Sequence, residues 1–230
     1  MPVSLAIGTH SLAAVTLTGR LADAVDQLRP AGRVLVAFDG PDAAGKTTLA
    51  DAVSERLSRP VLRTSVDSWH NPRHVRLGRG EDSPEGYFLD SFDLPALLTE
   101  CLVPFRAGIH RICTAAFDHR ADETLTSQEE AAANAALVVD GVFLLRAELR
   151  PWWDFSVYVD VPESVSLSRA LGRDLDLFGS DEEVRGRYIR RYLPGQALYR
   201  QHERPLDHAD VHIDNCDAQH PRILRWRNRG

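Results

Sequence analysis

The feature that most constrains the fold is a glycine-bounded loop that follows a short apolar run. Residues 33–38 (RVLVAF) have the pattern of a buried parallel strand, and residues 40–47 (GPDAAGKT) match GxxxxGK[ST] directly after it. Gly40 and Gly45 let the loop bend so that its backbone N–H groups face phosphate oxygens, and the following helix adds its positive N-terminus. We therefore expect a strand–loop–helix unit that binds phosphate, rather than a turn that carries a surface lysine.

The polar side chains of this loop have separate expected roles. Lys46 should reach the β- and γ-phosphates of a nucleotide, and the Thr47 hydroxyl should bind Mg²⁺. The motif predicts a nucleotide, either ATP or GTP, and says nothing about what receives a phosphate. The predicted phosphate-binding residues are Gly40, Pro41, Asp42, Ala43, Ala44, Gly45, Lys46, Thr47 and Thr48.

The rest of the chain alternates strand-like apolar runs with segments of helical periodicity. This alternation predicts the α/β class: a three-layer P-loop fold with a central, mostly parallel five-stranded sheet flanked by helices. We expect strands at residues 33–38, 61–66, 111–117, 136–140, 155–161 and 209–214, and helices at residues 46–57, 94–105, 127–135, 164–171 and 181–201.

These elements predict one P-loop domain over residues 31–230. Residues 1–30 precede the first core strand and are expected to form an N-terminal extension packed on the core. The region of about 164–195 should form a helical lid. The basic segment 222–229 (RILRWRNR) is expected to be a final helix or a surface extension, and the sequence indicates no function for it.

Composition limits the classes of partner. The net charge of −6 argues against a surface that coats nucleic acid, because such surfaces are basic. The three cysteines show neither paired spacing nor a histidine pattern, so we expect reduced thiols and no zinc site. No apolar run approaches the roughly 20 residues that cross a bilayer, and no signal peptide is recognised. A cytoplasmic protein that binds neither nucleic acid nor membrane is expected.

Two aspartates that end predicted strands are candidates for the chemistry. Asp140 ends the strand at 136–140, where a P-loop protein usually places the acid that holds Mg²⁺; the alternative is a turn aspartate before Gly141. Asp67 follows the strand at 61–66 and could accept the proton of an attacking hydroxyl across the crevice. It could equally cap a turn, and the residues alone leave these two roles for Asp67 even.

Several short motifs, in this order and spacing, resemble those of the uridine kinase and phosphoribulokinase family of P-loop kinases. The resemblance covers residues 33–215. The matching segments are Asp67–His70 (DSWH), Tyr87–Asp93 (YFLDSFD), Phe117–Arg120 (FDHR), Val138–Val142 (VVDGV), Val157–Asp160 (VYVD), Ser168–Asp174 (SRALGRD), Arg187–Pro194 and Ala209–Ile213 (ADVHI).

The resemblance implies a nucleoside kinase-like fold and an ATP-dependent kinase with Mg²⁺. It implies Asp67 as catalytic base beside Lys46, with Asp140 in place of the family's glutamate near Mg²⁺. It also implies that Arg169 and Arg173 lie on a lid helix over the phosphates, where they would neutralise the transferring group. The alternative for these and the neighbouring arginines is a solvated helix face, which is equally weighted. A homo-oligomer follows from family analogy only.

The acceptor half departs from the family pattern. Tyr87, Phe117 and Arg187 stand where uridine kinases have an aspartate, a tyrosine and a glutamine, so a different pocket is expected. Trp69, His70 and His119 could line it together with these three, although burial is the alternative for Trp69 and Tyr87. The predicted activity is γ-phosphate transfer to a hydroxyl of a nucleoside, or of a nucleoside-like or sugar-like acceptor.

Three other functions stay open at this stage. The loop also resembles that of thymidylate kinase, so a nucleoside-monophosphate kinase is the first rival, with Arg73, Arg76 and Arg79 available for an anionic acceptor. The second is a P-loop NTP hydrolase or switch without a small acceptor. A binding protein with a degenerate site is the third, and intact Lys46 and Thr47 argue against it.

Overall fold

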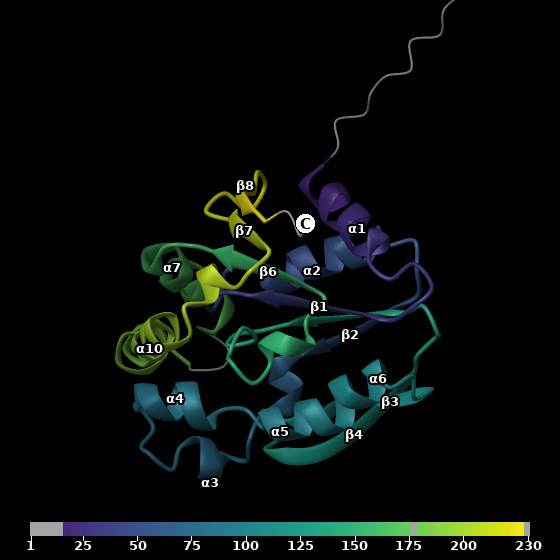
Figure 1. Ribbon diagram of the computed structural model, residues 1–230. Coiled ribbons are helices and arrows are strands. Elements are labelled where there is room, and N and C mark those ends of the chain that lie inside the picture. Colours follow the sequence, from purple (N-terminus) through teal and green to yellow (C-terminus); the bar gives the residue numbers. More distant parts are fainter. Residues whose placement is uncertain (1–15, 176–178, 228–230) are drawn as a thin grey trace, which may run out of the picture.

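The computed structural model describes residues 16–175 and 179–227, which form a sheet with helices on both faces (Figure 1). The sheet has the order β2-β5-β1-β6-β7-β8, in which all pairs are parallel except β7 with β8. Its strands are β1 (Val34–Asp39), β2 (Val61–Ser65), β5 (Ala136–Asp140), β6 (Phe155–Asp160), β7 (Val211–Asp214) and β8 (Arg222–Trp226). The predicted α/β class with a mostly parallel sheet is confirmed, and the antiparallel β8 makes six strands.

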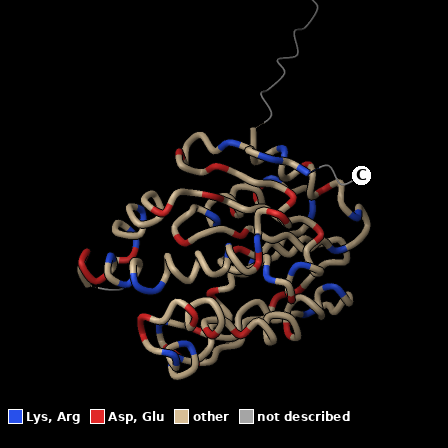
Figure 2. The backbone as a smooth tube through the Cα atoms, turned by 60° about the vertical axis from the view of Figure 1, so that its left-hand side comes forward, with Lys and Arg blue, Asp and Glu red and all other residues tan. Residues whose placement is uncertain are grey.

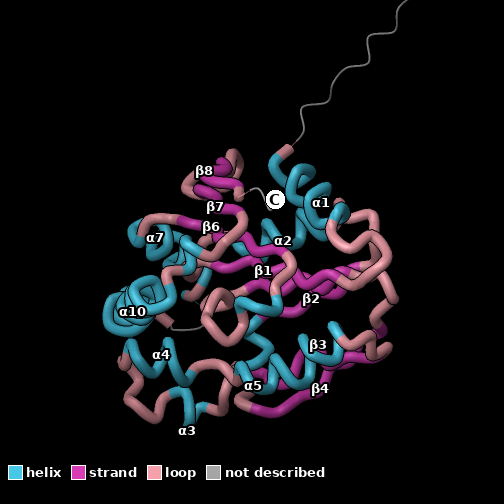
Figure 3. The backbone as a smooth tube through the Cα atoms, in the orientation of Figure 1, coloured by secondary structure: helices cyan, strands magenta, loops and turns pink. Residues whose placement is uncertain are grey.

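Alternate residues of the central strands separate the core into two layers. Val34, Val36 and Phe38 of β1 pack with helices α1 (Leu17–Gln27) and α2 (Lys46–Ser54) on one face. Leu35 and Ala37 face the opposite layer. That layer contains α4 (Pro84–Asp90), α5 (Leu94–Ala96), the π-helix η2 (Leu97–Leu102), α6 (Val103–Arg106) and α10 (Leu193–Glu203). Figure 3 shows the strands running between these helical layers.

The region expected to form a lid, called the lid region below, consists of short helices that pack on one another. It contains α7 (Glu163–Arg173), α9 (Asp181–Arg187) and the π-helix η4 (Tyr188–Tyr192), which continues into α10. Ala170, Val184 and Tyr188 form a small buried cluster. Further short elements are η1 (Val66–Trp69), α3 (Arg73–Arg76), η3 (Arg150–Trp152) and η5 (Pro205–Asp207).

One predicted helix is wrong and one predicted strand lies outside the central sheet, and both belong to one hairpin. The expected helix at 127–135 is instead strand β4 (Glu123–Glu130) and a connection, and β4 pairs antiparallel with β3 (Arg111–Asp118). The expected strand at 111–117 exists but lies in this two-stranded sheet, outside the central one. The alanine-rich segment 131–135 favours helix locally. The backbone groups of β3 nevertheless need a partner strand, and β4, which includes residues 127–130, supplies it.

The C-terminal segment also differs from its expected form. Residues 222–226 are the edge strand β8, which pairs with β7 through Val211 and Trp226 among others, and the indole of Trp226 contacts Phe155. The expected final helix is therefore wrong for these residues. The leader up to residue 15, which falls in the expected N-terminal extension, lies outside the described residues, whereas α1 buries Leu21 and Val25 against the core.

Helices α4 and α10 approach closely because a glycine lies between them. A Cβ atom on Gly195 would lie 2.7 Å from Tyr87 Cδ1 and 2.9 Å from the Pro84 carbonyl oxygen. We expect Gly195→Ala to lower the free energy of unfolding by about 1–3 kcal/mol, because a methyl group in a filled space forces the helices apart. Urea denaturation monitored by circular dichroism measures this change.

Gly172→Ala is the matched control. Gly172 is exposed on helix α7, and a Cβ atom added there would meet no neighbouring group within 4 Å. Alanine there should leave stability unchanged or raise it by up to about 1 kcal/mol. Equal effects of the two substitutions would contradict tight packing at Gly195.

Candidate active site

The phosphate loop has a shape that two glycines enforce. Gly40 has φ +149° and lies so close to β6 that a Cβ atom would meet the Val159 carbonyl oxygen at 2.1 Å. Gly45 has φ +86° and is the N-cap of α2; its Cβ would lie 2.6 Å from Asn215 Nδ2. Asn215 Nδ2 in turn donates to the Ala44 carbonyl oxygen at 2.6 Å. The loop is therefore fixed between β6 and the end of β7, with the start of α2 open to a ligand.

Lys46 lies almost buried at the centre of this site. Its Nζ donates to the Pro41 carbonyl oxygen at 2.6 Å. Burial lowers the pKa of Lys46, and four carboxylates oppose that shift. They belong to Asp39, Asp42, Asp67 and Asp140. Lys46 is thus the central cation of the site. One of the four aspartates lies in the loop, and the other three lie at the ends of β1, β2 and β5, where the carboxyl ends of parallel strands are expected to meet.

Thr47 and Asp140 provide adjacent oxygen atoms at the end of β5. The Thr47 hydroxyl donates to Asp140 Oδ2 at 2.6 Å, and Asp140 is buried. Mg²⁺ prefers oxygen ligands and is usually held by one or two protein groups together with nucleotide phosphates, so this pair fits the ion. Within the described residues no group of three or more His, Cys, Asp or Glu side chains is arranged to hold a metal.

An arginine that sequence reasoning missed holds Asp140 from the other side. Arg63 on β2 donates to Asp140 Oδ1 at 2.7 Å and to the Val138 carbonyl oxygen at 2.8 Å, and its Nε pairs with Asp51 at 3.0 Å. Arg63 therefore orients the carboxylate that faces Thr47. A cavity of about 360 Å³ begins beside Arg63 and Asp140 and extends to the β3–β4 hairpin.

The two predicted lid arginines lie over the phosphate loop. Arg169 and Arg173 of α7 line a cavity of about 300 Å³ together with Lys46 and other residues of the loop. Arg169 donates to the Asn215 carbonyl oxygen at 2.8 Å, and Arg173 pairs with Asp174 at 2.6 Å. The remaining lining residues are Ala43, Gly45, Thr47 and Thr48. The cavity is thus lined by three cations and by the N-terminus of α2, a set suited to phosphate groups.

Asp67 is exposed at the start of η1, directly after β2. Its backbone N–H donates to Ser65 Oγ at 3.3 Å, and its carbonyl oxygen contacts His70 Nδ1 at 2.9 Å. The charge of its carboxylate acts on both Lys46 and Asp42. The structure therefore places Asp67 beside the phosphate loop with its carboxylate open to an incoming group.

Two of the predicted acceptor residues stack on each other near Asp67. The rings of His70 and His119 are 4.7 Å apart, and His70 also contacts Phe92 at 4.5 Å. Burial lowers the pKa of His70 to about 4, so its imidazole is neutral at neutral pH. Phe117 is buried on β3 of the same hairpin. The contact between His70 and His119 therefore places the end of β3 next to the segment that carries Asp67.

The other three predicted acceptor residues have different surroundings. Trp69 is fully buried and donates its indole N–H to Thr64 Oγ1 at 3.1 Å, so it belongs to the core. Tyr87 is buried on α4 and donates its hydroxyl to Asp42 at 2.6 Å. Arg187 of α9 donates to the Glu81 carbonyl oxygen at 2.7 Å, in the loop between α3 and α4.

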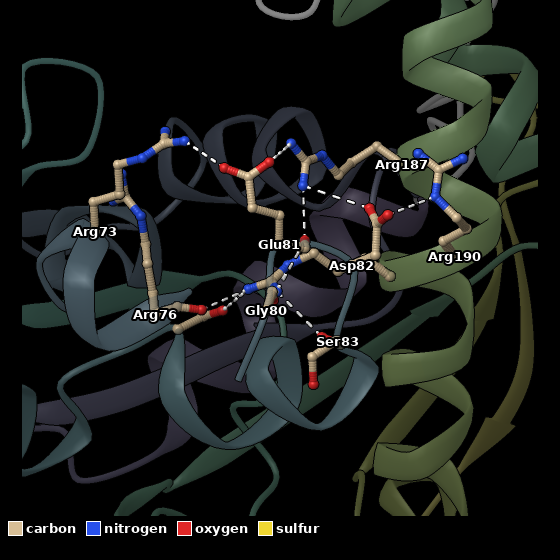
Figure 4. A network of polar contacts seen from close by, with 10 residues as sticks. Arg73, Arg76, Gly80, Glu81, Asp82, Ser83, Arg187 and Arg190 are labelled. Atoms are coloured by element: carbon tan, nitrogen blue, oxygen red, sulfur yellow. Dashed lines mark hydrogen bonds and ion pairs between the residues drawn. The ribbon is translucent and has the colours of Figure 1, made fainter. Parts of the chain in front are cut away.

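Arg187 is one member of a network that joins the lid to the α3–α4 loop (Figure 4). Arg190 pairs with Asp82 at 2.8 Å, and Arg187 approaches both Asp82 and Glu81. The buried Arg191 donates to the carbonyl oxygens of Arg76, Gly80, Glu81 and Ser83. Helices α9 and η4 are therefore joined to the α3–α4 loop by several hydrogen bonds and ion pairs. Figure 2 shows acidic and basic residues interspersed along the chain.

Asp39, at the end of β1, stabilises the start of the phosphate loop through hydrogen bonds to its carboxylate. Its carboxylate accepts hydrogen bonds from the backbone N–H groups of Gly40 at 2.7 Å and Leu145 at 3.0 Å, and from the Tyr199 hydroxyl. Complete burial nevertheless raises the pKa of Asp39 to about 6 from its usual 3.8. Asp39 directly follows the strand predicted at 33–38, whereas its partners Tyr199 and Leu145 carry no sequence signal.

We predict a pH dependence of stability that Asp39→Asn removes. Because the folded protein holds this proton more tightly than the unfolded chain, the contribution of Asp39 to stability falls as pH rises from about 4 to about 6. The difference in unfolding free energy between wild type and Asp39→Asn should therefore fall by about 3 kcal/mol over that window. Denaturant titrations at closely spaced pH values measure it, and parallel curves for the two proteins would contradict the raised pKa.

None of the helices that the structure describes is long and apolar enough to cross a membrane.

Comparison with known proteins identifies relatives of this chain. The model of the "Phosphoribulokinase / Uridine kinase family" matches residues 35–216. The chain is 26% identical over 147 residues to uridine-cytidine kinase A of Dictyostelium discoideum, covering 62% of this chain and 28% of that protein. It is 27% identical over 177 residues to a pantothenate kinase of Rhodopseudomonas palustris, covering 70% of this chain and 55% of that protein. The chain thus spans under a third of the first relative and about half of the second.

A solved structure extends the match to most of the fold. The structure described as a possible uridine kinase of Bacillus stearothermophilus superposes with a TM-score of 0.68 at 25% identity, covering 85% of this chain and 96% of that one. The family model spans the phosphate loop, Asp67, Asp140 and the lid arginines, which are the residues that the structure gathers around Lys46. The chain belongs to the phosphoribulokinase / uridine kinase family.

Proposed function

We propose that the protein is an ATP-dependent kinase that transfers the γ-phosphate to a hydroxyl of a small nucleoside-like or sugar-like acceptor. One observation carries this proposal: Lys46 of the phosphate loop lies between the cation-lined cavity of Arg169 and Arg173 and the exposed carboxylate of Asp67. A phosphate-binding cavity beside an exposed acid is the arrangement that in-line phosphoryl transfer to an alcohol requires.

Each residue has a role in the proposed reaction. The acceptor hydroxyl gives its proton to the Asp67 carboxylate as its oxygen attacks the γ-phosphorus, and the bond from that phosphorus to the β–γ bridging oxygen breaks. Lys46, Arg169 and Arg173 neutralise the charge on the transferring group and on the ADP that leaves. Mg²⁺, held by Thr47 and Asp140, would supply further charge neutralisation at the phosphates.

The arginines near the acceptor side favour a neutral acceptor over a nucleoside monophosphate. Arg73, Arg76 and Arg79, which could have bound an acceptor phosphate, each pair with a carboxylate of this chain. Their partners are Glu81, Asp122 and Asp90, at 2.8, 3.1 and 2.6 Å. A phosphate would have to displace these carboxylates, so the cluster provides no ready anion site.

The acceptor class is tested by measuring ADP release with Mg-ATP against four groups of acceptor. These are nucleosides, nucleoside monophosphates, pantothenate-like alcohols and free sugars. We expect ADP release at least tenfold above background with one uncharged hydroxyl compound, because Asp67 is exposed near Lys46 and its carboxylate can accept the hydroxyl proton. Acceptor-independent release would indicate a hydrolase instead, and stimulation by a monophosphate alone would indicate a nucleoside-monophosphate kinase.

Asp67→Asn tests the base directly. The amide cannot accept the proton, so kcat should fall by roughly 10²–10⁴-fold while the Kd for ATP stays within about threefold. Isothermal titration with a non-hydrolysable ATP analogue separates binding from turnover. Asp23→Asn, an exposed carboxylate on α1, is the matched control and should keep wild-type rates. Transfer by Asp67→Asn within tenfold of wild type would remove Asp67 as the base.

A further inference from the structure

The phosphate loop contains a carboxylate that is turned away from the phosphate cavity. Asp42 Oδ2 accepts hydrogen bonds from the Tyr87 hydroxyl on α4 and from Gln196 Nε2 on α10, each at 2.6 Å. Both donors bind the same oxygen atom, and Oδ1 accepts no hydrogen bond from the part of the chain that the structure describes. Asp42 is also absent from the residues that line the cavity beside Lys46. The side chain of Asp42 therefore points toward α4 and α10 rather than into that cavity, and its Oδ1 is available to a ligand.

The two donors are held rigidly in place. The Tyr87 ring makes edge contacts with Phe143 at 5.0 Å and with Tyr192 at 4.8 Å. Gly195 allows α10 to approach α4 closely, and this approach brings the next residue, Gln196, to Asp42. The carboxylate is thus fixed by two packed helices, as a preorganised binding group must be.

The surroundings of Gln196 are energetically unfavourable for its amide group. The side chain is buried, its Nε2 donates to Asp42, and its Oε1 has no donor among the described residues. A buried acceptor without a partner destabilises the folded protein, because it has lost its hydrogen bonds to water. Leucine would fill the same space without that loss. The amide is therefore better explained by the orientation that it gives to Asp42 than by packing.

Electrostatics indicates what Asp42 can bind. The charges of Lys46 and Arg173 act on it from the phosphate side, and the charge of Asp67 acts on it as well. A carboxylate here repels phosphate oxygens, so the phosphate-binding role predicted for Asp42 can belong to its backbone N–H but not to its side chain. A free carboxylate oxygen is an acceptor only, and a neutral ligand can satisfy it with a hydroxyl group.

We propose that Asp42 binds a second hydroxyl of the acceptor, so that the substrate is a neutral molecule with at least two neighbouring hydroxyls, such as a ribose or another sugar. Tyr87 and Gln196 are positioning residues that hold the carboxylate. Asp67 accepts the proton of the hydroxyl that is phosphorylated, and Asp42 accepts a hydrogen bond from the other. This inference rests on the proposed kinase function and narrows its acceptor class.

Asp42→Asn is the discriminating variant. Its side-chain oxygen can still accept from Tyr87 and Gln196, while the acceptor then meets an amide donor in place of Oδ1. The KM for uridine or D-ribose, whichever the wild type phosphorylates, should rise about 10–100-fold. The Kd of a non-hydrolysable ATP analogue, measured without acceptor, should stay equal or become tighter, because a negative charge near the phosphates is removed. A merely structural role would weaken both.

Deoxygenated acceptors test the contact itself. The wild type should use 2′-deoxyuridine or 3′-deoxyuridine, or the corresponding deoxyribose, about 10–100-fold less well in kcat/KM than the parent, for one of the two positions. Asp42→Asn should lose most of that discrimination. Equal discrimination by the two proteins would overturn the inference, and so would a wild-type enzyme that transfers phosphate to an acceptor with a single hydroxyl but to no nucleoside or sugar.

Two further variants separate positioning from folding. Tyr87→Phe and Gln196→Leu each remove one donor to Asp42, so the acceptor KM should rise by a smaller factor, with kcat and ATP affinity nearly unchanged. Gln201→Leu, on an exposed site of the same helix, is the control and should change none of these. Unchanged acceptor KM in both Tyr87→Phe and Gln196→Leu would contradict the positioning roles. ADP release without any acceptor would instead overturn the proposed kinase function, so the two failures are distinguishable.

Discussion

The buried ammonium group of Lys46 is the interaction on which the rest of the site depends. Four carboxylates surround it, and without this cation their mutual repulsion and their loss of hydration would be unfavourable. The lysine can occupy this position only because Gly40 fits against Val159 and Gly45 fits against Asn215. Backbone sterics thus determine where the charges meet, and the charges determine where a nucleotide phosphate can bind.

The charged groups around Lys46 also connect the phosphate-binding side of the site with the side that carries Asp67. Arg173 from the lid and Asp67 from the end of β2 both act electrostatically on Asp42, a residue of the loop itself. Asp42 in turn is bonded to α4 and α10. The lid region and the α3–α4 loop are also joined by the hydrogen bond from Arg191 to the Gly80 carbonyl oxygen and by the ion pair of Arg190 with Asp82.

The amino-acid sequence alone predicted those parts of the fold and of the site that short local patterns specify. The loop from Gly40 to Thr47 and the strand ends at Asp67 and Asp140 depend on short patterns, and the structure places them together. The β3–β4 hairpin was missed because its second strand follows no apolar alternation, and residues 131–135 favour helix by composition. Pairing between distant segments decided its structure, and a local pattern does not contain that information.

Contacts between side chains of distant elements were beyond sequence reasoning for the same physical reason. Arg63 and Asp140 lie 77 positions apart, and Gln196 and Asp42 lie 154 apart. Nothing in either local sequence marks these pairs. Yet they determine how the carboxylates point, and orientation separates a carboxylate that can bind a hydroxyl from one that is only nearby. In Asp42, both donors bind one oxygen and leave the other without a donor among the described residues, so the acceptor contact that we propose depends on geometry that only the folded chain contains.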